Sequence, residues 1–290
     1  MIAVGIGECF GAGTIVSAVA TGKGASFGLD LKVKAKVTLT DEKKFVLKNE
    51  DFKEDSLLAE LACKKTLDFF GKNYGAIIET ESNIPVSKGL KSSSASSIAI
   101  IRATANSLGI EMKKEDMLKI SCDASLEAGV SITGAFDDAS ACLFGGVFVT
   151  DNIKRKVLVS YEIKPELEVL IYVPPGIVKK ESVKKYNFRL GKLKPLVEYA
   201  HELALKGDYF TAMNLNGLIY SNAFEQYRSA EVAMIMLNSG ALSAGMSGTG
   251  PSVVSLVDKK NTESVIEAVN SKIEDDAKII RTSVRNFERD

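Results

Sequence analysis

The sequence contains no tryptophan and only one histidine, His201, among its 290 residues. Ser–His nucleophiles and histidine-based metal sites therefore have almost no material here, and we expect His201 to be structural or solvent-facing. The four cysteines form no CxxC pair, and their neighbours are mostly apolar. We expect buried free thiols of the kind found in a reducing cytosol. These cysteines are Cys9, Cys63, Cys122 and Cys142.

An excess of charge of one sign is also missing. The 37 Lys and Arg residues balance 37 Asp and Glu residues, whereas a nucleic-acid-binding protein is expected to carry a basic excess and, for RNA, an aromatic platform. No stretch reaches the ~20 apolar residues of a membrane span, and the N-terminal sequence lacks the pattern of a signal peptide. We therefore predict a cytoplasmic protein without nucleic-acid or membrane partners. Whether it is a monomer or a homodimer stays open.

The common nucleotide-binding motifs are absent as well. Gly-Lys occurs at 22–23, 71–72 and 191–192 but never precedes Ser or Thr, so the chain has no GxxxxGK[ST] sequence. It also has no GxGxxG sequence and no protein-kinase signature. Because these motifs carry the phosphate contacts of P-loop and Rossmann proteins, neither fold is supported.

Strand and helix patterns alternate along the chain without low-complexity linkers or repeats. Residues 31–40 alternate between apolar and polar side chains, which predicts a strand with one face in a core. We predict an α+β chain with two halves, residues 1–153 and 154–290, that share an extensive interface because no Pro/Gly linker separates them. The other predicted strands are 75–81, 145–151, 156–162, 167–174, 252–257 and 277–284, and the predicted helices are 56–70, 93–108, 114–129, most of 195–239, and 262–273.

A serine-rich stretch, IPVSKGLKSSSASSIAIIRAT (84–104), lies between a predicted strand and the helix at 93–108. One capping residue would be enough for folding, and a run of small polar residues inside a helix is unfavourable. Backbone N–H groups at a helix start, a nearby glycine, hydroxyls and lysines are what an anion site needs. We favour a phosphate site over a simple Ser-capped helix. Its candidate residues are Lys88, Gly89, Lys91, Ser92, Ser93 and Ser94.

Two further stretches carry polar residues in apolar surroundings. Asp137 and Asp138 lie in GAFDDASACLFGG (134–146), and buried carboxylates need a metal, a lysine or a substrate hydroxyl as partner. The alternative is a pair of residues that caps a helix start. The glycine-rich stretch GALSAGMSGTGPSVVSLV (240–257) can point backbone amides inward as an anion nest, or can form a plain turn.

Together these stretches resemble the GHMP kinases, the superfamily that includes galactokinase, homoserine kinase and mevalonate kinase. The family's phosphate loop, P-x-x-x-G-L-x-S-S, is matched by residues 85–93, and GMSGTGPS resembles its glycine-rich third motif. The resemblance implies an N-terminal domain like ribosomal protein S5 domain 2, a ferredoxin-like C-terminal domain, and ATP bound between them.

Within this superfamily the sequence is most similar to the archaeal-type shikimate kinases. The stretches that carry the likeness are GAGTIVSAVATGKGASFGLDLKVKAKV, IPVSKGLKSSSASS and SITGAFDDASACLFGG. The resemblance implies transfer of phosphate from ATP to shikimate, which gives shikimate 3-phosphate and ADP for aromatic amino-acid biosynthesis. Homoserine kinase, or another small-alcohol kinase of the superfamily, is the alternative. A nucleotide sensor without activity is disfavoured because a binding module would not need a base.

The resemblance also implies roles for individual residues. Asp137 matches the catalytic Asp, and Lys23 resembles the Lys that would keep it ionised. Ser93 and Glu127 resemble the residues that place Mg²⁺, although the spacing of Glu127 from Asp137 is not identical to that of the family. The phosphate-loop residues that would bind ATP are Pro85, Lys88, Gly89, Leu90, Lys91, Ser92, Ser93, Ser94 and Ala95.

Three positions depart from the family pattern. Lys91 stands where many relatives have Gly or another small residue, Ser94 where Ala is usual, and Asp138 where Asn is frequent. Lys91 either adds a charge against the phosphates or faces water.

The acceptor site is placed by the resemblance alone, which implies shikimate as the acceptor. Its carboxylate requires a cation, for which Arg189 in the basic loop KKESVKKYNFRLGK is the most suitable candidate. A solvated basic loop is the alternative. Asp137, Gly248 and Thr249 complete the predicted substrate site.

Overall fold

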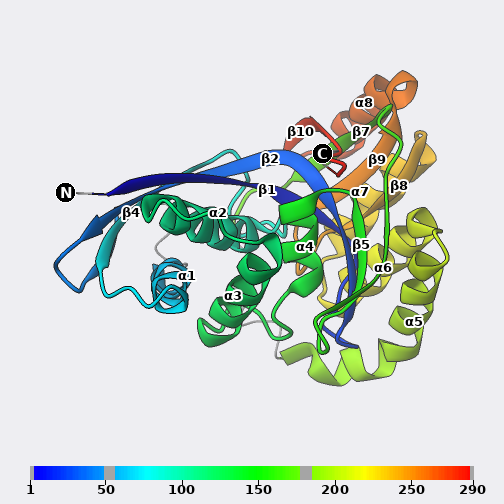
Figure 1. Ribbon diagram of the computed structural model, residues 1–290. Helices are drawn as coiled ribbons and strands as arrows, with labels where there is room; N and C mark the ends of the chain where they lie inside the picture. Colours follow the sequence, from blue (N-terminus) through cyan, green and yellow to red (C-terminus); the bar gives the residue numbers. More distant parts are fainter. Residues whose placement is uncertain (1–2, 49–55, 177–184, 288–290) are drawn as a thin grey trace.

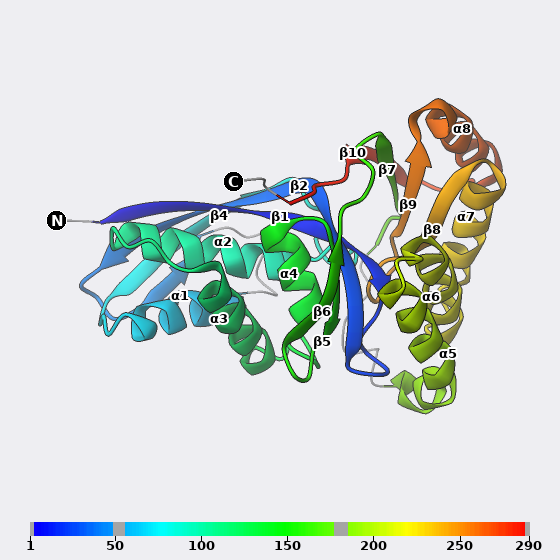
Figure 2. The ribbon, with the colours of Figure 1, turned by 45° about the vertical axis from the view of Figure 1, so that its right-hand side comes forward.

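The computed structural model describes residues 3–48, 56–176 and 185–287. Two sheets with helices packed against them make up the molecule (Figures 1 and 2). The first sheet has the order β3–β4–β2–β5–β6, and β1 pairs with β2 outside this order. All its pairs are antiparallel except β3–β4. Its strands are β1 (Val4–Val16), β2 (Lys23–Thr40), β3 (Phe45–Leu47), β4 (Gly75–Ser82), β5 (Val147–Asp151) and β6 (Lys156–Tyr161).

Strand β2 joins the parts of the first sheet. Its residues 31–39 alternate between buried apolar side chains and more exposed polar ones, as period-two burial requires. The alternation predicted a strand at 31–40, and β2 continues this strand back to Lys23. Its two ends pair with different neighbours, β5 and β4, so β2 spans the whole sheet.

Helices α1, α2 and α4 pack on one face of the first sheet, and α3 packs against these three helices (Figure 1). Glycines in β1 allow α2 to pack closely, because a Cβ atom at Gly5 would lie 2.1 Å from the Ala103 carbonyl oxygen and one at Gly7 would lie 2.3 Å from that of Ala99. The backbone of α2 therefore rests directly on β1. These helices are α1 (Ser56–Phe69), α2 (Ser92–Ser107), α3 (Lys114–Glu127) and α4 (Phe136–Phe144).

The second sheet has the antiparallel order β10–β7–β9–β8. Strand β7 is buried on both faces: Val169 and Ile171 belong to the core of the first sheet, whereas Leu170 and Tyr172 pack with the helices of the second half. The elements of this half are β7 (Leu167–Val173), α5 (Asn187–Leu205), α6 (Tyr209–Ala223), α7 (Tyr227–Asn238), β8 (Ala241–Met246), β9 (Val253–Asp258), the 3₁₀ helix η3 (Lys259–Asn261), α8 (Thr262–Lys272) and β10 (Lys278–Ser283).

One hydrophobic core runs from the first sheet into the second, which confirms the α+β class and the extensive interface. The division at residues 153 and 154 stays a prediction. Strand β6 follows that point and still pairs with β5 in the first sheet. This pairing favours a boundary between Tyr161 and Leu167.

The elements predicted from periodicity are confirmed within a few residues at most of their ends. Five elements were missed: β1, which is rich in glycine, the short elements β3, α4 and η3, and β8, which lies in the stretch interpreted as a glycine-rich turn. All four cysteines are buried thiols, and His201 is buried with its Nε2 3.2 Å from the Thr150 carbonyl oxygen. Burial lowers the pKa of His201, so the histidine is structural.

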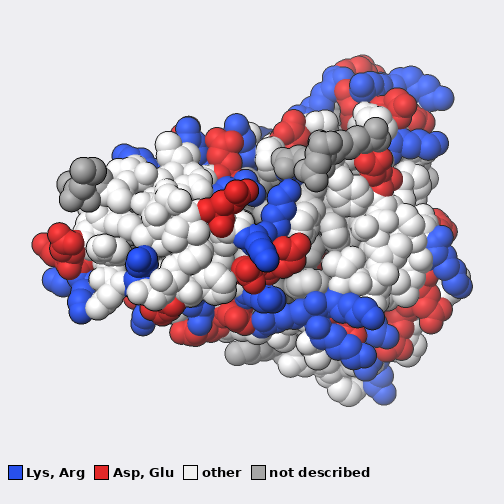
Figure 3. Space-filling model, viewed as in Figure 1, with Lys and Arg blue, Asp and Glu red and all other residues white. Residues whose placement is uncertain are grey.

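Surface charge follows the balanced composition. On the face seen in Figure 3, acidic and basic side chains are interspersed, and Lys and Arg gather over the first half of α5, which carries Arg189, Lys192 and Lys194. In the part of the chain that the structure describes, none of the helices has the length and apolar character needed to cross a lipid bilayer.

Candidate active site

A cavity of about 440 Å³ opens where four distant parts of the chain meet. The serine-rich stretch, the acidic pair and the glycine-rich stretch, which the sequence separates widely, all line it. The fourth part is the β1–β2 turn. The lining residues fall within 17–19, 87–94 and 125–138, together with Gly248 and Thr249.

The serine-rich stretch turns sharply before α2 begins. Gly89 has a φ of 81° and Lys91 a φ of 63°, both in the left-handed region. A Cβ atom at Gly89 would lie 2.0 Å from the Ser247 carbonyl oxygen, so glycine is required there. The first N–H groups of a helix lack intrahelical acceptors, and the helix dipole adds positive character. The start of α2, with Ser92, Ser93 and Ser94 at the cavity wall, can therefore bind an anion.

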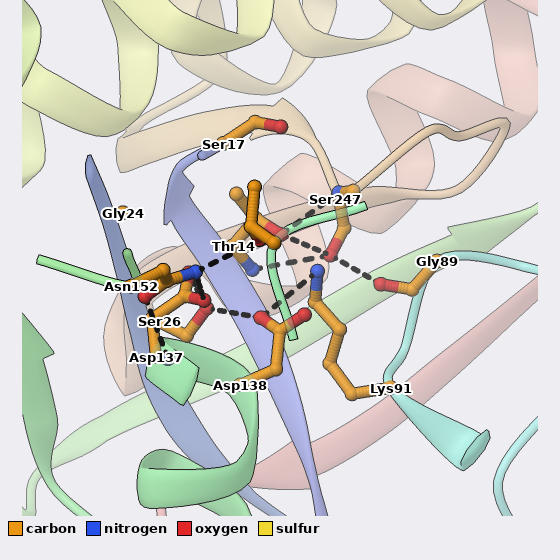
Figure 4. A network of polar contacts seen from close by, with 12 residues as sticks. Thr14, Ser17, Gly24, Ser26, Gly89, Lys91, Asp137, Asp138, Asn152 and Ser247 are labelled. Carbon is orange, nitrogen blue, oxygen red and sulfur yellow. Dashed lines mark hydrogen bonds and ion pairs between the residues drawn. The ribbon is translucent and has the colours of Figure 1, made fainter. Parts of the chain in front are cut away.

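The glycine-rich loop of the second half is hydrogen-bonded to the serine-rich loop and to β1. The Ser247 hydroxyl donates to the Gly89 carbonyl over 2.8 Å and accepts from the Thr14 N–H over 3.1 Å. The Gly248 N–H in turn donates to the Thr14 hydroxyl over 2.8 Å. Figure 4 shows Ser247 between Thr14 and Gly89. These bonds hold Gly248 and Thr249 at the cavity.

The acidic pair lies in the first turn of α4. Asp137 is only 3% exposed, and Asn152 Nδ2 donates to its Oδ1 over 2.7 Å. The Asn152 Oδ1 accepts the Asp137 N–H over 3.1 Å, so one amide orients both the backbone and the carboxyl group. Ser26 Oγ lies 2.6 Å from Asp138 Oδ1 and 3.3 Å from Asp137 Oδ2. The cap residue Ala135 makes no side-chain hydrogen bond, so the acids are not simple capping residues.

The environment of Asp137 changes its acidity. Burial, and after it the negative charge of Asp138, raises the pKa of Asp137 to about 7, while the charge of Lys91 and the Asn152 hydrogen bond act in the opposite direction. A carboxyl group that titrates near neutral pH can exchange a proton with a hydroxyl at the cavity.

Lys91 points into the cavity and not into water. Its side chain is 10% exposed, and its Nζ lies 3.1 Å from Asp138 Oδ1. Gly248 is close to the same Nζ. Among the described residues that line the cavity, Lys91 is the only Lys or Arg.

Comparison with known proteins identifies the family. Residues 57–146 match the GHMP kinases N terminal domain, and residues 200–275 match the GHMP kinases C terminal domain. The chain belongs to the GHMP kinase family. Membership of a kinase family implies ATP as the phosphate donor.

The similarity to individual relatives covers almost the whole chain of this GHMP kinase. A shikimate kinase of Methanothrix thermoacetophila is 38% identical over 282 residues, which cover 97% of this chain and 94% of the relative. A mevalonate kinase structure of Methanococcus jannaschii matches with a TM-score of 0.73 and 20% identity over 97% of this chain and 98% of that one. A homoserine kinase structure of Cytophaga hutchinsonii matches with a TM-score of 0.74 and 19% identity, over 97% of this chain and 96% of that one. The two structures confirm the two-domain GHMP kinase fold.

Two residues with predicted roles lie outside the cavity of this GHMP kinase. Lys23 is exposed on β2, one position before Gly24, so its side chain lies on the other face of the strand from Asp137. Glu127 is also exposed, at the end of α3, and forms a 2.6 Å ion pair with Lys65. The geometry does not support their predicted roles beside Asp137 and Mg²⁺.

Two predicted cations are also engaged elsewhere. Arg189 on α5 forms a 2.8 Å ion pair with Glu225 and is not at the cavity wall. Part of its basic loop, residues 179–184, lies outside the described residues. Lys88 is buried and donates to the carbonyl groups of Pro174 and Gly176, so it ties the phosphate loop to the end of β7.

The remaining residues of the predicted phosphate loop support its shape. Leu90 is buried, and its carbonyl oxygen accepts the Ala12 N–H over 3.3 Å. The Ala95 N–H donates to the Lys91 carbonyl over 3.0 Å, which closes the first turn of α2. Pro85 directly precedes the turn at residues 86–89. These three residues do not line the cavity.

Sequence reasoning missed Thr14, Ser26 and Asn152. Each is an ordinary polar residue in or beside a strand, and no local pattern marks it. Ser26 lies two positions after Gly24 and therefore on the same face of β2. A Cβ atom at Gly24 would lie 2.4 Å from Asp137 Oδ2, so the face was identifiable only once Asp137 was placed against it.

Proposed function

We propose that this chain is a shikimate kinase that transfers the γ-phosphoryl group of ATP to a hydroxyl of shikimate, giving shikimate 3-phosphate and ADP. The observation that carries the proposal is the meeting of a buried acid, Asp137, and the start of α2 in one cavity. The 38% identity to a shikimate kinase over 97% of the chain supports this acceptor.

The anion site at the start of α2 is suited to the phosphates of ATP. Phosphoryl transfer depends mainly on positioning and on neutralising charge over the transferred group. Backbone N–H groups of residues 89–95 would hold the phosphates, and the loop with Gly248 and Thr249 would close the site from the second half. Lys91 supplies positive charge at the cavity between the start of α2 and this loop.

Asp137 is placed to act on the acceptor hydroxyl. When ionised, it would accept a hydrogen bond from this hydroxyl and take its proton as the oxygen bonds to the γ-phosphorus. The bond from that phosphorus to the oxygen of ADP breaks at the same time. Asn152 and Ser26 fix the orientation of the carboxyl group.

We propose that Mg²⁺ binds mainly through the phosphates. Within residues 3–48, 56–176 and 185–287, no three His, Cys, Asp or Glu side chains are grouped closely enough to hold a metal ion. Mg²⁺ often keeps several waters and binds through few protein groups together with substrate phosphates. The donor set at the start of α2 fits this mode, with the Ser93 hydroxyl as the protein ligand. A bound ion would neutralise phosphate charge.

A coupled assay of ADP release tests the acceptor. We expect ADP release with shikimate and a kcat/KM at least about 100-fold lower with homoserine or mevalonate, because an ill-fitting acceptor leaves polar groups of the site unpaired. Equal or greater turnover with homoserine would favour the alternative small-alcohol kinase. Binding of ATP without ADP release for any of the three acceptors would favour a nucleotide sensor.

Ser93→Ala tests the metal ligand. We expect the Mg²⁺ concentration for half-maximal turnover to rise about tenfold, as for the loss of one favourable polar contact, with the unfolding midpoint unchanged. Ser97→Ala is the matched control, since Ser97 is buried on the same helix and its hydroxyl is without a hydrogen-bond partner. An unchanged magnesium requirement in Ser93→Ala would count against the assignment.

A further inference from the structure

Two charged residues at the cavity contact each other. The structure joins Lys91 and Asp138 by a 3.1 Å ion pair. The two side chains are only 10% and 16% exposed. Removal of one partner from an ion pair this far from water leaves an uncompensated charge. The two side chains therefore form a single charged unit.

A chain of polar contacts connects this pair to Asp137 (Figure 4). Asp138 Oδ1 is within 3.1 Å of Lys91 Nζ and within 2.6 Å of Ser26 Oγ. The same Ser26 oxygen lies 3.3 Å from Asp137 Oδ2. Ser26 has only one hydroxyl proton, and its shorter contact is to Asp138. The charge of Asp138 therefore affects the ionisation of Asp137 in two ways: directly through space, and through the Ser26 hydroxyl that contacts both carboxyl groups.

We propose that Lys91 is a positioning residue that, by neutralising Asp138, keeps Asp137 in the ionised form able to accept the substrate proton; Lys91 and Asp138 together are called the positioning pair. This inference rests on the proposed function of Asp137 as the base. Because Lys91 neutralises Asp138, ionised Asp137 is the only uncompensated negative charge of this group of three side chains. Without Lys91, the two ionised aspartates would repel each other. Lys91 thus takes the part that the sequence suggested for Lys23, which lies on the other face of β2.

The other groups around Asp137 do not supply this charge. Asn152 and Ser26 are neutral, and burial raises the pKa of the nearby Cys122 thiol to about 12, so it stays protonated. Arg155, whose charge also reaches Cys122, is paired with Asp123 at 2.5 Å. Among the described residues, the groups around Asp137 are Gly24 and Ser26 from β2, Asn152 after β5, Cys122 from α3, Asp138 from α4, and one cation, Lys91, ahead of α2.

The pH dependence of kcat/KM measures the effect of the pair. We expect Lys91→Met to move the acidic limb upward by about one pH unit, because a carboxylate without a nearby cation is harder to ionise. Asp138→Asn should move the limb downward by about the same amount, and the double variant should return it to within about half a unit of wild type. Lys91→Arg, which retains the charge, should leave it in place.

Titration of ¹³C-labelled aspartate carboxyl groups by NMR, in the free protein, gives the same shifts without an acceptor. If no acceptor is phosphorylated but the NMR titration of Asp137 moves as expected, the proposed function fails and the positioning pair stands. Asp138→Asn keeps nearly the same volume, so it serves if Lys91→Met does not fold. The matched control is Lys36→Met, which removes a lysine from an exposed 3.1 Å pair with Glu79 on the first sheet.

Two results would overturn the proposal. One is an acidic limb and an Asp137 titration that stay in place in both Lys91→Met and Asp138→Asn. The other is a rise in KM for ATP in Lys91→Met with an unmoved acidic limb, which would assign Lys91 to phosphate binding alone.

Discussion

Asp137→Asn is expected to lower kcat by about 100- to 10,000-fold, the usual contribution of a positioned acid or base. The substitution preserves the size of the side chain and the acceptor for the Asn152 amide, so it removes the base and little else. Nucleotide binding should change little, because the start of α2 is untouched. Single-turnover kinetics with saturating ATP and acceptor measure this loss.

The role of Asp137 as the base also predicts how kcat/KM of the wild-type protein depends on pH. Since the base must be ionised and its pKa is about 7, kcat/KM should fall as pH drops through about 7. The raised pKa also means that the folded state favours the protonated acid, so stability from this group is lost as pH rises from about 4 to about 7. Asp137→Asn should therefore unfold at a higher temperature than wild type at pH 8.

The matched control for this variant is Asp116→Asn, which also replaces an acid in the first turn of a helix but lies outside the cavity. It should retain wild-type kcat and the wild-type pH profile. Near-wild-type turnover in Asp137→Asn would exclude Asp137 as the base.

Gly24→Ala is expected to lower kcat by about 100-fold, as for a misplacement of a reacting group by about 1 Å. The added Cβ would lie 2.4 Å from Asp137 Oδ2 and 2.7 Å from its Cγ. The carboxyl group must move, because it is the more mobile of the two, and its contacts with Ser26 and Asn152 would break. Steady-state kinetics together with NMR of the Asp137 carboxyl group measure the displacement.

Gly191→Ala is the control for the glycine substitution. Gly191 lies in α5, and a Cβ atom there would meet nothing within 4 Å. Kinetics should be unchanged, and stability should be equal or slightly higher because alanine favours a helix more than glycine. Wild-type kcat in Gly24→Ala would mean that the carboxyl group does not need its observed position.

The secondary structure was predictable where one face of an element packs on a core. Residues 31–39 alternate in burial as they alternate in polarity, so the sequence pattern carried the strand. The missed strand β1 contains four glycines, which local propensity disfavours in strands, and the missed strand β8 contains one, Gly245. Their glycines are explained by long-range packing: a Cβ atom at Gly5 would clash with α2, and one at Gly245 would lie 2.7 Å from the Met213 carbonyl oxygen in α6.

The candidate site was predictable as motifs but not as contacts. Residues 85–93 and Asp137 carried enough local chemistry to be singled out, and they do meet in one cavity. Lys23 and Glu127 were chosen by position in the chain, which does not determine the face of a strand or the direction of a side chain. Ser26 and Asn152 carry no local signal, because their value lies only in their nearness to Asp137.

The sequence by itself determined the class of this protein: a balanced α+β chain whose polar motifs belong to a GHMP kinase. Local patterns carry that information because helix starts, strand alternation and tight turns depend on neighbouring residues. Only the tertiary structure decided which cation faces the acids. Lys91 directly precedes α2, and Asp138 lies in the first turn of α4. The two residues are far apart in the chain, and their pairing exists only because the starts of α2 and α4 converge on the same buried cavity.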